Sequence, residues 1–190
     1  MKEDIPTLIH QAWQADSQGD VAQARTHYLA AARQLASDHA WPELTTVLGN
    51  LGMLGEAGRE GSAAHLTQAF WLCLFVRVPI ASVIGLARAL LDRLGAAHEA
   101  APLIAATTLL LVNERGGEHP DREALQTNAL MLLARCAEVR GLAEDRVAGW
   151  FSGQRLNDPA QVIPATQRAL IGIVGGEEWL FDPRAFADRQ

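Results

Sequence analysis

Apolar residues recur every three or four positions along most of this chain, which is the spacing of one face of an α-helix. Leu8, Ile9, Ala12 and Trp13 share such a face near the N-terminus. Later segments repeat the spacing at Val83, Leu86, Ala87, Leu90 and Leu91, and at Leu130, Leu133, Ala134 and Ala137. β-branched residues form no alternating runs, so strands are not expected. The pattern therefore predicts an all-α fold.

Prolines and capping residues mark where the helices begin. Asp158 precedes Pro159, so its carboxylate can cap a helix whose first position is proline. Asp182-Pro183 repeats this arrangement. Three further prolines fit helix starts, since a first-turn proline gives up no hydrogen bond: Pro42, Pro79 and Pro120. The predicted helices cover residues 5–18, 21–37, 42–56, 61–77, 79–94, 97–113, 121–140, 143–156 and 159–174, with a short turn near 183–188.

Two prolines and one loop disturb this map. Pro102 either lies in the first turns of the 97–113 helix or marks its true start. Pro164 is expected to kink the 159–174 helix or to shift its start. Gly116-Gly117-Glu118-His119 indicates a loop, but the helices after it are too few to bury a core alone. We therefore expect one domain over residues 1–190.

The segment Gln18-Gly19-Asp20 predicts a tight turn between two antiparallel helices. Ala24 lets the two backbones approach each other, and Tyr28 fills the space one turn later. Similar glycine turns are expected near Gly58, Gly95 and Gly141. Together these turns predict stacked helical hairpins.

The first hairpin resembles the tetratricopeptide repeat family, whose 34-residue units follow the pattern W-x2-L-G-x2-Y…A-x3-F…P. Its matching positions are Leu8, Ala12, Ala15, the Gln18–Asp20 turn, Ala24, Tyr28 and Ala31. Later units depart from the pattern: the 55–61 turn is longer, Arg88 and Arg146 replace small residues, and no unit ends in the family's proline.

The resemblance implies a right-handed stack of antiparallel helical hairpins, a tetratricopeptide-like α-solenoid. The expected repeats cover residues 5–38, 42–77, 79–113 and 121–157, and a C-terminal cap covers 158–190. The alternatives are a generic α-solenoid and a closed or irregular helical bundle.

In the resembled family, peptides bind the concave face formed by the first helix of each hairpin. The resemblance implies these partner-binding residues: Ile9, Trp13, Asp16, Asn50, Arg93, Met131 and Arg135. Gly85, Ala89, Asp92 and Glu138 share that face by position, and Met53 accompanies Asn50. Trp and Arg often dominate binding energy at interfaces. In the competing interpretation Trp13 covers the end of the stack, and the arginines are solvated or paired.

Charge argues against nucleic acid and membrane partners. The formal net charge is −6, Lys2 is the only lysine, and the arginines are spread along the chain. Nucleic acids and anionic membranes require clustered positive charge. The apolar runs 69–76 and 103–112 are shorter than the roughly 18 residues that a membrane span needs.

No residue pattern indicates catalysis, a cofactor or a metal site. The chain has no nucleophile elbow, P-loop or dinucleotide fingerprint. His119 has a carboxylate at helical spacing near a helix start, Glu123, but two ligands do not make a site. Adjacent Glu177 and Glu178 are interpreted as a solvated cap. We expect no enzyme activity.

Cysteine usage and the N-terminus favour a cytoplasmic protein. Cys73 and Cys136 lie in apolar helical patterns and match no zinc or redox motif, so buried free thiols in a reducing compartment are expected. The segment before Pro6 contains no apolar core of a secretory signal.

The C-terminal segment is unusually aromatic. Trp179, Leu180, Phe181 and Phe186 are expected to cover the last hairpin, or else to dock onto another subunit or into the protein's own groove. The hypothesis is a non-enzymatic adaptor that binds a protein or peptide on its concave face. Two alternatives stay open: a homo-oligomeric structural or regulatory protein, such as a homodimer, and an all-α small-molecule sensor.

Overall fold

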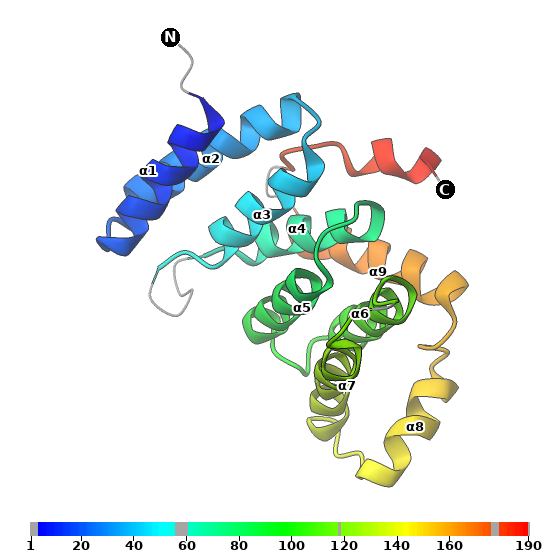
Figure 1. Cartoon of the computed structure of the whole chain (residues 1–190). Coiled ribbons are helices and arrows are strands. Elements are labelled where there is room, and N and C mark those ends of the chain that lie inside the picture. The colour runs from blue at the N-terminus through cyan, green and yellow to red at the C-terminus, as the bar shows by residue number, and fades with distance from the viewer. Residues whose placement is uncertain (1–3, 56–60, 118, 176–178, 190) are drawn as a thin grey trace. The chain divides into compact units, whose positions relative to one another are not determined.

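The computed structural model describes residues 4–55, 61–117, 119–175 and 179–189 (Figure 1). Within these residues the chain is helical and contains no strand. The helices are α1 Ile5–Ser17, α2 Val21–Ser37, α3 Trp41–Gly52, α4 Ala63–Phe75, α5 Ile80–Leu94, α6 Ala101–Arg115, α7 Arg122–Glu138, α8 Glu144–Gly153 and α9 Pro159–Val174. A 3₁₀ helix, Pro183–Arg189, follows. The all-α prediction is confirmed.

The helices begin close to the prolines and capping residues that mark their predicted starts. The Asp158 carboxylate accepts a hydrogen bond from the Ala160 N–H at 3.1 Å, and Asp182 does the same for Arg184 at 2.9 Å. Pro102 lies in the first turn of α6, which begins at Ala101 instead of residue 97. Pro164 lies inside α9 and does not shift its start.

The chain divides into two compact units. Unit 1 contains residues 1–77 and 173–190, so it is built from both ends of the chain. Unit 2 contains residues 78–172. Each unit is described by itself below.

In unit 1, α1 packs on α2, α2 on α3, and α3 on α4. The predicted turn between α1 and α2 is confirmed: Gly19 has φ +78°, a backbone conformation that favours glycine. Asp20 caps α2 by accepting a hydrogen bond from the Gln23 N–H at 3.0 Å. Ala24 and Tyr28 are buried, as predicted.

The other predicted glycine turns are confirmed where the structure describes them. Gly95 has φ +85° at the end of α5 and Gly141 has φ +68° in the turn after α7, and a positive φ favours glycine. Gly58 lies outside the described residues. In unit 2, α6 packs on both α5 and α7, α5 contacts α7, and α7 contacts α8.

The aromatic C-terminal segment packs within unit 1. Trp179 lies edge-to-face against Trp71 of α4, with 5.6 Å between ring centroids, and Phe186 lies against Trp41 of α3 at 5.1 Å. The Leu180 N–H donates a 3.0 Å hydrogen bond to the side-chain oxygen of Gln68, which is fully buried. The expectation that this segment covers the last hairpin is wrong, because its ring partners lie on α3 and α4.

A candidate binding groove on unit 2

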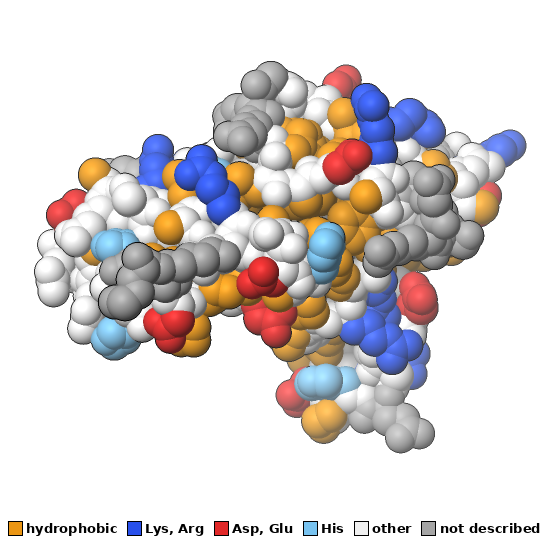
Figure 2. Space-filling view, turned by 90° about the horizontal axis from the view of Figure 1, so that it is seen from above, with side chains coloured by type: hydrophobic (Ala, Val, Ile, Leu, Met, Phe, Trp, Pro, Cys, Tyr) orange, Lys and Arg blue, Asp and Glu red, His pale blue; other side chains and the backbone are white. Residues whose placement is uncertain are grey.

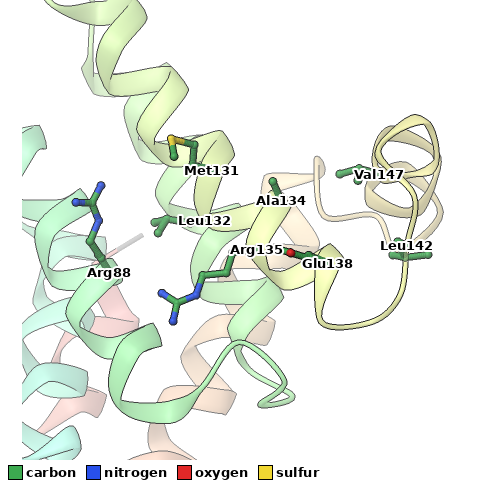
Figure 3. Close-up of a pocket in the computed structure, with 8 residues that line it drawn as sticks. All are labelled: Arg88, Met131, Leu132, Ala134, Arg135, Glu138, Leu142 and Val147. Carbon is green, nitrogen blue, oxygen red and sulfur yellow. The ribbon is translucent and has the colours of Figure 1, made fainter.

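A groove of about 760 Å³ opens on unit 2 (Figure 3). Three parts of the chain form its walls: α5, the exposed side of α7, and α8 with the turn before it. The lining residues are Arg88, Met131, Leu132, Ala134, Arg135, Glu138, Leu142 and Val147.

The sequence of α7 explains why this helix has an apolar side that remains uncovered. Its buried residues are Leu125, Ala129, Leu132, Leu133, Cys136 and Ala137. Leu130 and Met131 lie outside that set and are 51% and 61% exposed. The apolar residues of α7 thus cover more of its circumference than its neighbours bury. Of these two exposed residues, Met131 lines the groove.

An ion pair joins two helices in the groove wall. The Arg135 guanidinium on α7 pairs with the Asp92 carboxylate on α5. Both side chains are about half exposed, at 44% and 55%, so the pair contributes little to folding stability. It does neutralise the Arg135 charge locally.

The charges at the two ends of the groove are not neutralised in this way. Arg88 donates from Nη2 to the neutral Asn128 side-chain oxygen at 3.3 Å. Glu138 is exposed on the last turn of α7. Neither forms an ion pair with another described residue. Figure 3 shows Arg88 at one end of the groove and Glu138 toward the other, with Met131, Leu132 and Ala134 between them.

Arg140 secures the corner where α7 leads into α8. Its Nη1 donates to the carbonyl oxygens of Ala96 at 2.9 Å and Cys136 at 2.7 Å, and its guanidinium lies 6.0 Å from the centre of the Trp150 ring. These contacts fix the end of α7 to the turn between α5 and α6. Burial raises the pKa of the Cys136 thiol above its usual range, which keeps this thiol protonated and unreactive.

Two of the predicted partner-binding residues, Met131 and Arg135, line the groove, and so does Glu138 from the same predicted face. Arg93 is half-buried in the last turn of α5 and does not line it. Asp92 contributes through its ion pair with Arg135.

The other predicted partner-binding residues, Ile9, Trp13, Asp16 and Asn50, belong to unit 1. The Asp16 carboxylate accepts a 3.2 Å hydrogen bond from the Gly55 N–H. Burial and the nearby Asp16 charge raise the pKa of Tyr28, and a side-chain hydrogen bond between Tyr28 and Asn50 offsets part of this rise. Asp16 and Asn50 therefore already have structural partners. Trp13 is 61% exposed and stacks on His10 at 6.4 Å.

Sequence reasoning did not select Arg88, Leu142 or Val147 as site residues. Arg88 gave a usable signal, because it is a long charged residue where the repeat pattern expects a small one. Leu142 and Val147 gave none, since only the packing of α8 against α7 brings them to the groove.

Two further findings on the described residues concern metal binding and membrane crossing. They contain no group of three or more His, Cys, Asp and Glu side chains placed to hold a metal ion. His119 Nδ1 instead accepts a 3.1 Å hydrogen bond from the Asp121 N–H. None of the described helices combines the length and the apolar character needed to cross a bilayer.

Comparisons of the chain with protein-family models, with curated proteins and with solved structures gave no match.

Proposed function

We propose that this protein is a non-enzymatic adaptor whose unit 2 groove binds a segment of a partner protein. The observation that carries the proposal is Met131, which is 61% exposed in a groove of about 760 Å³. Exposed apolar surface inside a concave site is costly in water, and burying it on a partner recovers that free energy.

The form of the groove supports a peptide-like partner. Helical proteins commonly bind an amphipathic segment by laying its apolar face into a groove between helices. Here α5 and α7 supply two of the three walls, and they are the first helices of the third and fourth expected hairpins. Three of its lining residues, Met131, Arg135 and Glu138, belong to the face on which the resemblance to tetratricopeptide repeats implies a bound peptide.

Surface charge supports a protein partner over nucleic acid. The net charge is −6, and Figure 2 shows basic and acidic side chains interspersed over the visible face, without a continuous basic field. Phosphate backbones bind to clustered positive charge.

The test is a selection from a phage-displayed library of 16-residue segments, followed by affinity measurements on recovered peptides. Met131→Glu should weaken binding about tenfold or more, because it puts a charge where an apolar side chain must be buried. The matched control is Ile171→Glu, which puts the same charge on an exposed apolar position of α9 that does not line the groove. The control should bind like the wild type.

Three results would contradict the proposal: no enrichment over the Met131→Glu background, equal binding by Met131→Glu and the wild type, or equal losses in both variants. Analytical ultracentrifugation separates the homodimer alternative. A wild-type dimer that Met131→Glu converts to monomer would assign the groove to a second copy of this chain.

A further inference from the structure

We propose that the groove selects a partner segment of mixed charge: an amphipathic helix with a carboxylate at one end and a Lys or Arg at the other. This inference rests on the proposed function, since it specifies the occupant of the same groove. The preference for mixed charge follows from a difference among the charged residues of the groove: some already have an ionic partner and others do not.

The positive end of the groove is Arg88. Among the described residues its guanidinium donates to a neutral acceptor, the Asn128 side-chain oxygen at 3.3 Å, and forms no ion pair, so its charge is available to a ligand. Arg88 is exposed, and its planar guanidinium can bind a carboxylate through two parallel hydrogen bonds.

The centre of the groove is effectively neutral. Arg135 lies between the two ends, but its charge is offset by Asp92. Met131, Leu132 and Ala134 also line the groove and lie between Arg88 and Glu138 in Figure 3. The middle of the occupant therefore needs apolar side chains rather than an acidic one.

The negative end of the groove is Glu138, which is exposed and forms no ion pair with another described residue. Glu138 lies ten residues after Asn128 on α7, a rise of about 15 Å. A partner helix of about three turns spans that distance, and its terminal charges would meet Arg88 and Glu138. A uniformly acidic or basic segment would meet a like charge at one end, which disfavours it.

The experiment uses the same phage-displayed 16-residue library against the wild type and two charge-reversal variants. The wild type should enrich segments with an acidic residue near one end and a basic residue near the other. Arg88→Glu makes both ends negative and should enrich segments that are basic at both ends. Glu138→Arg makes both ends positive and should enrich segments that are acidic at both ends.

The effect on affinity should be modest, because these charges are exposed. For one mixed-charge peptide recovered on the wild type, each reversal should weaken binding about two- to fivefold at low salt and less at high salt. Arg88→Gln and Glu138→Gln should give intermediate losses. Circular dichroism of every variant should match the wild type, because none of these side chains is buried.

Two results would overturn the inference, and they are distinguishable. Enrichment of apolar segments with no charge pattern, or the same pattern on all three proteins, contradicts the charge selection and leaves the groove as a binding site. Absence of any enrichment that depends on Met131 contradicts the proposed function as well.

Discussion

Gly52 and Gly85 both lie inside helices, but their surroundings differ. A Cβ on Gly52 of α3 would overlap the Leu66 side chain of α4 and lie 3.0 Å from the Leu66 backbone nitrogen. A Cβ on Gly85 of α5 would meet nothing within 4 Å. The first glycine permits close helix packing, whereas the second has no steric reason to be glycine.

Gly52→Ala should therefore lower the free energy of unfolding by about 1–3 kcal/mol, the usual cost of overpacking. Gly85→Ala should raise it by about 0.5–1 kcal/mol, since alanine is the better helix former. Urea unfolding followed by circular dichroism measures both changes. Equal destabilisation by the two substitutions would show that helix propensity and available space do not explain these positions.

Some residues of the groove could be predicted from the sequence, but the partners of its charged side chains could not. Met131 and Arg135 could be selected from the sequence because the resemblance to tetratricopeptide repeats assigns positions along a single helix, which is local information. The partners of the charged residues could not, because Arg135 meets Asp92 43 positions earlier and Arg88 meets Asn128 40 positions later. Which charge stays unpaired is decided only when α5 and α7 pack together.

At the scale of the helices, local signals predicted the elements well. The apolar period, the cap aspartates and the first-turn prolines all act within one or two helical turns, so helix positions follow from the sequence. The surface on which residues 179–186 pack does not follow from the sequence in this way. Aromatic residues indicate burial but not the surface that buries them, and the choice of α3 and α4 depends on the path of the whole chain.

A buried pair of threonine hydroxyls joins α6 to α9, and substitutions can test its contribution to stability. Thr107 and Thr166 are fully buried, and their Oγ1 atoms lie 2.7 Å apart. The Thr166 hydroxyl also donates to the Leu103 carbonyl oxygen at 3.3 Å, so Thr107 donates to Thr166. This order makes the two threonines unequal.

Thr166→Val should cost about 1–3 kcal/mol of stability, because it leaves the buried Thr107 hydroxyl without its partner. Thr107→Val should cost less, since Thr166 keeps the Leu103 carbonyl. The double variant should cost less than the sum of the two, because no buried hydroxyl is left unsatisfied. Thermal unfolding of the three variants tests this, and additive losses would rule out a coupled pair.

At the scale of the whole molecule, unit 1 depends on both ends of the chain. Phe186 is 3% exposed and lies 5.1 Å from Trp41, 5.3 Å from Phe75 and 5.7 Å from Phe181, measured between ring centroids. The C-terminal segment is therefore part of the core of unit 1, although more than 100 residues separate Phe186 from Phe75 along the chain. Unit 2 is formed by the intervening residues.

Phe186→Ala should thus destabilise unit 1 by about 3–5 kcal/mol, the range for removing a buried aromatic ring. Hydrogen–deuterium exchange should quicken in α1–α4, whereas α5–α7 should keep their wild-type protection, because their contacts lie within unit 2. Arg184→Ala, an exposed change in the same segment, is the control and should leave both regions unchanged. Faster exchange in α5–α7 to the same degree would mean that the two units unfold as one cooperative body. Peptide binding by Phe186→Ala then follows from the same reasoning: with unit 2 intact, its groove should retain wild-type affinity.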